Sequence, residues 1–156
     1  MRKVFISYSI EDRNLHLITL LLEHLRKNNF DVVVSNPGMD STMRIINANL
    51  FIGIVTNNSN SINYVINEWR IANRNNIQKI LIVEDGVTIN DSNISYIRFS
   101  RSNPQKAINE LFNLNKSEIP APKKKKDSDD TLSNVLTGVA IIAGVAALIS
   151  LLSKDK

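Results

Sequence analysis

Short apolar segments rich in β-branched residues alternate with segments of helical periodicity over residues 1–114, and this alternation constrains the fold most strongly. Parallel strands joined by helices form a sheet with helices on both faces. Five such segments predict an α/β fold with a flavodoxin-like parallel sheet of order 2-1-3-4-5, in which ligands bind beyond the carboxyl ends of the first and third strands. The predicted strands are Lys3–Ser7, Asp31–Ser35, Leu50–Val55, Lys79–Val83 and Ile94–Phe99.

Four segments have the periodicity of helices. The first lies between the first two strands, and Ser9 followed by Asp12 resembles the capping box that opens a helix. The other three predicted helices are Asp40–Asn47, Ser61–Ala72 and Asn103–Phe112.

The composition excludes several classes of site. The chain holds no cysteine and only two histidines, His16 and His24, which lie in one leucine-rich segment. These counts exclude a disulfide scaffold and a cysteine nucleophile, and they leave no spacing typical of a metal site. The net charge of +4 does not mark the domain as basic, because residues 1–122 hold 13 basic and 11 acidic side chains. We therefore expect no bound metal and no nucleic-acid partner.

The C-terminal part of the sequence differs in character from the rest. Residues 115–130 are predicted to form a charged linker, which includes the lysine block Lys123–Lys126. Residues 131–153 carry no charge. The apolar part, Val135–Leu152, would span roughly 27 Å as a helix, close to the hydrocarbon thickness of a bilayer. We expect a single-pass transmembrane helix over 131–153, with the N-terminal domain cytoplasmic and the lysines near anionic lipid. Small residues along one stripe favour self-association of this helix, and a buried soluble helix is the alternative.

The predicted helix Ser61–Ala72 concentrates the polar chemistry of the chain. Its apolar residues fall on one stripe, while Ser61, Tyr64 and Glu68 fall on another, at i, i+3 and i+7. The helix begins at the rim where the first and third strands end, so Glu68 is expected near the ligand crevice. Each residue also has a plainer interpretation: Glu68 as a solvated carboxylate, Ser61 as a helix N-cap and Trp69 as a core residue.

Four stretches in this order, Val4–Ser9, Glu11–Arg13, Ala48–Thr56 and Ser61–Ala72, resemble a TIR (Toll/interleukin-1 receptor) domain of the bacterial kind. The resemblance covers about residues 1–115 and implies the same doubly wound fold. TIR domains commonly open with a FISYS-like strand and an acidic turn, and they carry a serine–aromatic–glutamate–alanine helix.

The resemblance also implies an activity. Many TIR domains cleave NAD at the nicotinamide–ribose bond with one glutamate, and Glu68 matches its position. A carboxylate there would stabilise the oxocarbenium-like charge that develops on the ribose. Tyr8 and Ser9 would line the NAD site, with Ser61 and Tyr64 as further contacts on the helix. NAD would be the substrate, so no cofactor and no metal are expected.

The sequence departs from the family pattern at the second strand. The region Ser35–Ile46 is short, and the tryptophan often found near the end of that strand is absent. The pair Glu84 and Asp85 after the fourth strand resembles paired carboxylates, although a solvated turn before Gly86 explains it better.

The leading hypothesis is therefore a membrane-anchored TIR-domain NAD hydrolase or ADP-ribosyl-type signalling enzyme in bacterial defence against phage. Activity in this family usually depends on assembly of the domains, and a self-associating membrane helix would raise their effective concentration. The first alternative is a non-catalytic module that recruits other TIR domains to a membrane through Asn36–Arg44. The second alternative is an effector whose membrane helix disrupts the bilayer.

Overall fold

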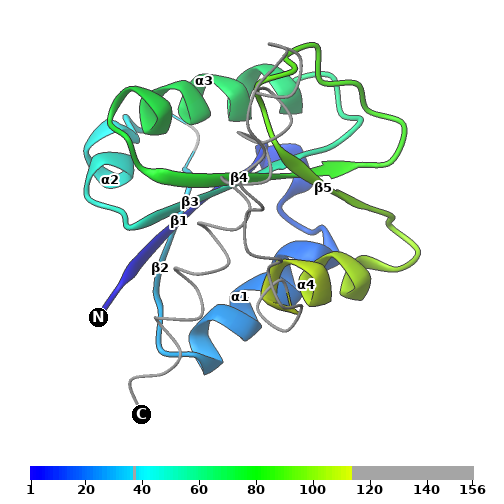
Figure 1. The fold of residues 1–156 in the computed structure, drawn as a ribbon, viewed down its shortest axis with the longest axis horizontal. Helices are drawn as coiled ribbons and strands as arrows, with labels where there is room; N and C mark the ends of the chain where they lie inside the picture. The colour runs from blue at the N-terminus through cyan, green and yellow to red at the C-terminus, as the bar shows by residue number, and fades with distance from the viewer. Residues whose placement is uncertain (37, 114–156) are drawn as a thin grey trace, which may run out of the picture.

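The computed structural model describes residues 1–36 and 38–113 (Figure 1). Its strands form one five-stranded sheet of order β2-β1-β3-β4-β5, and every neighbouring pair is parallel. The predicted sheet and its order are therefore confirmed. The strands are β1 Lys3–Ser7, β2 Asp31–Val34, β3 Leu50–Val55, β4 Gln78–Glu84 and β5 Tyr96–Phe99.

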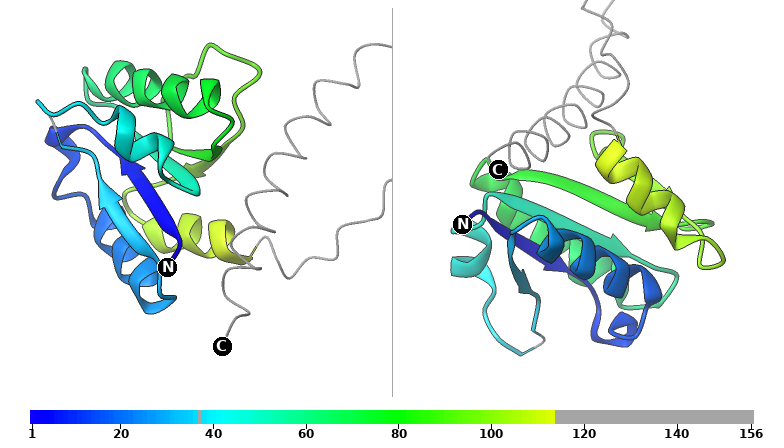
Figure 2. Two further views of the ribbon diagram at one scale, coloured as in Figure 1. Left: turned by 90° about the vertical axis from the view of Figure 1, so that its left-hand side faces the viewer. Right: turned by 90° about the horizontal axis from the view of Figure 1, so that it is seen from below.

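Helices cover both faces of this sheet, as the alternation predicted (Figures 1 and 2). Helix α1 (His16–Lys27) lies with α4 (Pro104–Asn113) on one face, and α2 (Thr42–Ile46) lies with α3 (Ser61–Arg74) on the other. In this order β1 and β3 are neighbours. The connection after β1 leads to β2 on one side, and the connection after β3 leads to β4 on the other side, so a crevice opens at the carboxyl ends of β1 and β3.

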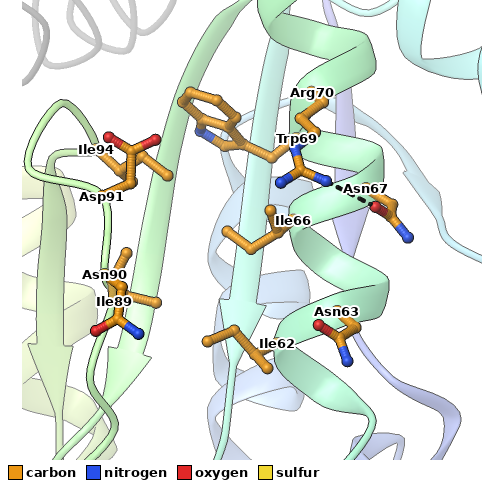
Figure 3. Close-up of a pocket in the computed structure, with 10 residues that line it drawn as sticks. All are labelled: Ile62, Asn63, Ile66, Asn67, Trp69, Arg70, Ile89, Asn90, Asp91 and Ile94. Carbon is orange, nitrogen blue, oxygen red and sulfur yellow. Dashed lines mark hydrogen bonds between the residues drawn. The ribbon is translucent and has the colours of Figure 1, made fainter.

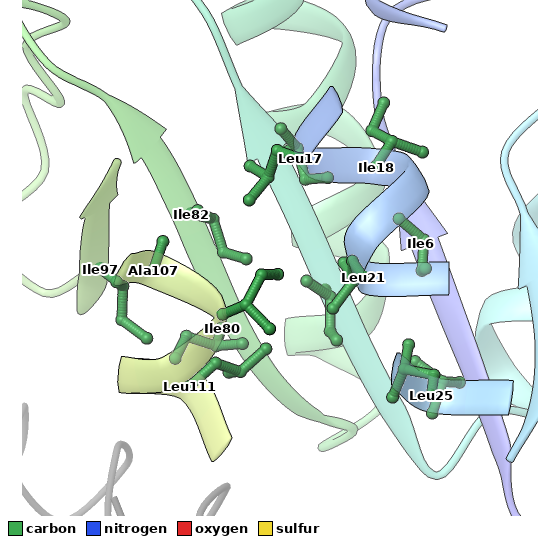
Figure 4. Close-up of a cluster of buried hydrophobic side chains, with 14 of the residues drawn as sticks. Ile6, Leu17, Ile18, Leu21, Leu25, Ile80, Ile82, Ile97, Ala107 and Leu111 are labelled. Atoms are coloured by element: carbon green, nitrogen blue, oxygen red, sulfur yellow. The ribbon is translucent and has the colours of Figure 1, made fainter. Parts of the chain in front are cut away.

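Two apolar clusters, one on each face, form the core. Leu17, Leu21 and Leu25 on α1 pack with Ile80 and Ile82 of β4 in the first cluster (Figure 4). The second cluster joins α2 and α3 to the opposite face of the sheet. All six residues of β3 are buried, as expected for a central parallel strand covered on both sides.

The start of the first helix differs from the prediction. Ser9 makes no side-chain capping bond, the chain forms a short 3-10 turn over Ile10–Asp12, and α1 begins only at His16. The physical reason is that the Asp12 carboxylate is buried and accepts hydrogen bonds from Thr56 instead of facing a helix amide.

The N-cap of α3 also differs from the prediction. Asn60 occupies the cap position, and Ser61 is the first helical residue. The Ser61 hydroxyl is fully buried and accepts a 3.0 Å hydrogen bond from the Thr56 amide. Ser61 therefore ties the start of α3 to the end of β3.

Gly53 allows α3 to lie close to the sheet. A Cβ atom at this position would lie 2.5 Å from Leu81 Cδ2 and 2.7 Å from Val65 Cγ1, well inside van der Waals contact. Val65 precedes Glu68 by about one helical turn, so this close approach also fixes the depth at which Glu68 meets the sheet.

We expect Gly53→Ala to lower the free energy of unfolding by about 1–3 kcal/mol, because the added methyl group must push α3 or Leu81 outward. Chemical denaturation of the two proteins measures the difference. Asn73→Ala, on the exposed side of the same helix, is the control and should change stability by less than about 0.5 kcal/mol. Equal stability of wild type and Gly53→Ala would contradict the close packing.

No helix within residues 1–36 and 38–113 is long and apolar enough to cross a membrane. The predicted linker, 115–130, and the predicted transmembrane helix, 131–153, lie outside the described residues.

Candidate functional site

Glu68 lies on the inner side of α3, at the carboxyl end of β1, and is only 7% exposed. Both of its carboxylate oxygens accept hydrogen bonds from serine hydroxyls. Ser7 Oγ donates to Oε2 over 2.5 Å, and Ser35 Oγ donates to Oε1 over 3.2 Å. The two serines end the neighbouring strands β1 and β2 or directly follow them, so the sheet itself presents both donors. Glu68 is therefore a buried carboxylate with each oxygen satisfied.

Tyr64 joins this arrangement one turn earlier on α3. Its hydroxyl lies 2.5 Å from Ser35 Oγ, so Ser35 connects the phenol to the carboxylate of Glu68. Burial raises the pKa of Tyr64, and the nearby Glu68 and Tyr8 raise it further, while the hydrogen bond between Tyr64 and Ser35 opposes the rise. We call Ser7, Ser35, Tyr64 and Glu68 the glutamate cluster.

A cavity of about 330 Å³ opens beside the glutamate cluster and shares Ser35 with it. Two arginines line this cavity: Arg13, directly after the 3-10 turn, and Arg44, on α2. No acidic side chain lines it. Within the described residues neither arginine forms an ion pair with a carboxylate. The cavity is thus electropositive at its rim, and it suits an anion such as a phosphate. Its lining residues are Tyr8, Ile10, Arg13, Val34, Ser35, Asn36 and Arg44.

A second polar network lies at the carboxyl edge of β1 and β3. Asp12 is buried, and its carboxylate accepts hydrogen bonds from Thr56 Oγ1 over 2.8 and 2.9 Å, from Asn58 Nδ2 and from Ser61. Burial raises the pKa of Asp12, while these hydrogen bonds and the charge of Arg101 oppose the rise. The network holds the 3-10 turn against the loop that leads into α3.

Glu84 ends β4 and is held by Arg101. The two side chains form an ion pair, and Glu84 Oε2 also accepts the Asn57 amide over 2.9 Å. The hydrogen bond from Arg101 lowers the pKa of Glu84. Asp85 is exposed. These two carboxylates therefore do not converge on one ligand. Asp85 lies in the expected solvated turn, whereas Glu84 ends β4 and is held in an ion pair.

The structure brings some of the predicted site residues together and separates others. Glu68 and Tyr64 share the glutamate cluster, and Tyr8 lines the adjoining cavity. Ser61 belongs to the Asp12 network instead. Ser9 is buried at the 3-10 turn, where its carbonyl accepts the Asp12 amide.

Sequence reasoning missed Ser7 and Ser35 as partners of Glu68. The sequence does contain a signal for these contacts. Each serine ends an apolar segment predicted to be a strand, and the two strands are neighbours in the predicted order. Polar residues at the carboxyl ends of adjacent parallel strands meet at one edge of the sheet. Among the described residues, no group of three or more histidine or acidic side chains could hold a metal ion.

Comparison with known proteins finds likenesses among solved structures. No protein-family model matches the sequence, and no curated protein matches it. Among solved structures, the chain is similar to one from the "Crystal structure of the RPS4 and RRS1 TIR domain heterodimer". The identity is 16%, the match covers 94% of this chain and 97% of that chain, and the TM-score is 0.41. A likeness at this level does not assign a family.

Proposed function

We propose that this chain hydrolyses NAD to ADP-ribose and nicotinamide, with Glu68 as the catalytic carboxylate. One observation carries the proposal: a buried glutamate at the carboxyl edge of the sheet has both oxygens held by hydroxyl donors. Beside it is a cavity lined by two arginines, neither of which pairs with a carboxylate among the described residues. The resemblance of the sequence to TIR domains names the substrate. Release of nicotinamide by wild type compared with Glu68→Gln tests the proposal directly.

The reaction needs little from the protein beyond a well-placed negative charge. The nicotinamide–ribose bond breaks with its electron pair moving to the pyridinium nitrogen, which leaves neutral nicotinamide and a ribosyl cation. The Glu68 carboxylate stabilises that cation. Water then forms a bond to C1′ and releases a proton, so NAD⁺ and water give ADP-ribose, nicotinamide and H⁺.

Ser35 is the point at which a substrate would reach Glu68. It lines the cavity, and its hydrogen bond to Glu68 Oε1, at 3.2 Å, is longer than the 2.5 Å bond from Ser7. A ribose hydroxyl that enters the cavity would replace the Ser35 hydroxyl on Oε1, while Ser7 keeps hold of Oε2. The carboxylate would then already face the sugar when the glycosidic bond breaks.

Arg13 and Arg44 would bind the diphosphate of NAD. We expect Arg44→Gln to raise KM for NAD about tenfold with little change in kcat, because a charge-assisted hydrogen bond far from the reacting carbon is lost. Steady-state kinetics measure the split between KM and kcat. Arg74→Gln, an exposed arginine on α3 outside the cavity, is the control. An equal effect of both substitutions would contradict a specific diphosphate contact.

The cellular setting is also a proposal. The uncharged segment 131–153 would anchor the chain in a membrane with residues 1–114 cytoplasmic, and the lysine block Lys123–Lys126 would contact anionic lipid. Self-association through the domain and the anchor would raise the local concentration of active sites. The resemblance to bacterial TIR proteins suggests a role in defence against phage.

A non-catalytic recruitment module is the second candidate, and a specific surface favours it. Four of the five large apolar side chains that are exposed among the described residues, Ile10, Met39, Met43 and Ile46, lie on the 3-10 turn, α2 and the loop before it. Met39 and Met43 are 53% and 63% exposed, and flexible methionines are common on protein-binding surfaces. This candidate predicts that signalling survives Glu68→Gln and fails after Met43→Ser.

A further inference from the structure

A second cavity, of about 510 Å³, lies between α3 and the loop that joins β4 to β5 (Figure 3). Glu68 does not line it, because the cavity faces another side of α3. Its volume is within the range of small-molecule sites, about 300–1,000 Å³. The lining residues are Ile62, Asn63, Ile66, Asn67, Trp69, Arg70, Ile89, Asn90, Asp91 and Ile94.

The lining divides into apolar walls and a polar rim. Ile62 and Ile66 on α3 point toward the loop that carries Ile89 and Ile94, as Figure 3 shows. A flat apolar ring would fit between these walls and lose its contact with water. At the rim, asparagine side chains from both α3 and the loop provide hydrogen-bond donors and acceptors.

The charge of this cavity differs from that of the cavity beside Glu68. Its two charged lining residues, Arg70 and Asp91, have opposite signs, so the lining is neutral overall. The cavity beside Glu68 has two arginines and no acid. A neutral ligand therefore suits the cavity along α3, whereas a phosphate-bearing ligand suits the other.

Trp69 supplies an aromatic surface in a fixed position. Its indole is half-buried, and the Lys79 ammonium lies over the ring, 5.4 Å from the centroid. Burial also lowers the pKa of Lys79. The prediction that Trp69 is a core residue is therefore only partly right, because one part of the indole lines a cavity.

Two asparagine side chains that line the cavity are available to form hydrogen bonds with a ligand. Asn67 Oδ1 accepts a 3.2 Å hydrogen bond from Arg70, and Asp91 accepts the Asn93 amide. Asn63 and Asn90 make no side-chain hydrogen bond within the part of the chain that the structure describes. An asparagine amide matches the N6 and N7 edge of adenine with one donor and one acceptor.

We propose that this second cavity binds a neutral purine nucleoside, with the ring between the isoleucine walls beside Trp69 and its edge on Asn63 and Asn90. Stacking of a base on an aromatic side chain and pairing with an amide both favour this class over a fatty or a charged ligand. The site is separate from the glutamate cluster, so it does not depend on cleavage of NAD.

Trp69 gives a direct readout, because it is the only tryptophan in the chain. Adenosine is titrated into the full chain, held in detergent, while tryptophan fluorescence is recorded. We expect saturable quenching as the base approaches the indole. Asn63→Ala combined with Asn90→Ala should weaken the apparent affinity at least about fivefold, the effect of one lost hydrogen bond.

Further variants separate a specific site from general quenching. Ile62→Phe fills the cavity and should abolish saturation, while Asn73→Ala, an exposed asparagine of the same helix, should bind adenosine as wild type does. Arg44→Gln, in the other cavity, should also leave quenching unchanged. Circular dichroism confirms that each variant is folded. The proposal is overturned if quenching does not saturate up to the solubility limit of adenosine, or if the folded cavity variants bind as wild type does.

Discussion

Replacement of Glu68 by glutamine should slow the release of nicotinamide from NAD about 10²–10³-fold, the effect of removing one electrostatic stabiliser of a transition state. Glutamine has the same shape but no negative charge, so the ribosyl cation loses its stabilising partner. The fold should persist, because the Ser7 hydroxyl can bond to either end of the glutamine amide. It donates if the amide oxygen faces it and accepts if the amide nitrogen does. A coupled assay of nicotinamide against time measures the rate.

A matched control is available on the opposite face of the molecule. Glu23 is an exposed glutamate on α1, and Glu23→Gln should leave the rate unchanged. Thermal unfolding of both variants shows whether a lost rate is a lost fold. If Glu68→Gln hydrolyses NAD within about threefold of the wild-type rate, Glu68 is not the catalytic carboxylate.

Replacement of Asp12 by alanine should lower the free energy of unfolding by about 2–4 kcal/mol. The substitution leaves the hydroxyls of Thr56 and Ser61 and the amide of Asn58 without their buried acceptor. The melting temperature should fall by roughly 10–20 °C. Asp40→Ala, at a fully exposed aspartate, should have a much smaller effect in the same measurement.

The raised pKa of Asp12 also determines whether the free energy of unfolding rises or falls with pH. The pKa of Asp12 is raised in the folded state above its ordinary value of 3.8, so the folded protein binds this proton more tightly than the unfolded chain. The free energy of unfolding should therefore fall as pH rises from 3.8 through the folded-state pKa, and then level off. Asp12→Asn removes the titrating group, so stability measured relative to this variant isolates the effect. A relative stability that rises over that range would contradict the burial of Asp12.

Strand order followed from the sequence because each strand is a short run of β-branched residues between turn signals. The bounds of β1 and β3 match the predicted ranges, and β5 is shorter, beginning at Tyr96 rather than Ile94. Parallel pairing and helices on both faces then left few possible topologies. The local sequence pattern predicted the wrong start for the first helix, because a tertiary contact replaced a local one. Asp12 accepts a hydrogen bond from Thr56 instead of taking part in the expected helix cap.

The grouping of Tyr64 with Glu68 could be predicted from helix geometry alone. The spacing of Tyr64 and Glu68 put them on one face of α3, and the structure connects them through Ser35. The same spacing grouped Ser61 with them, but Ser61 lies seven residues, or about 10.5 Å, along the helix axis from Glu68. The Ser61 hydroxyl bonds to Thr56 instead.

Other parts of the site depend on long-range packing that no local pattern contains. Ser7 and Ser35 are far apart in sequence from Glu68, by 61 and 33 residues, and become its partners only when β1, β2 and α3 assemble. The second cavity arises where α3 faces the β4–β5 loop, so it depends on how segments far apart in the sequence pack against each other.

The most direct test of the account is the time course of free nicotinamide formed from NAD by the full chain, reconstituted at high density in lipid vesicles. Wild type should release nicotinamide and ADP-ribose in equal amounts, and Glu68→Gln should release both about 10²–10³-fold more slowly. A wild-type protein that is folded, densely reconstituted and still leaves NAD intact would contradict the account.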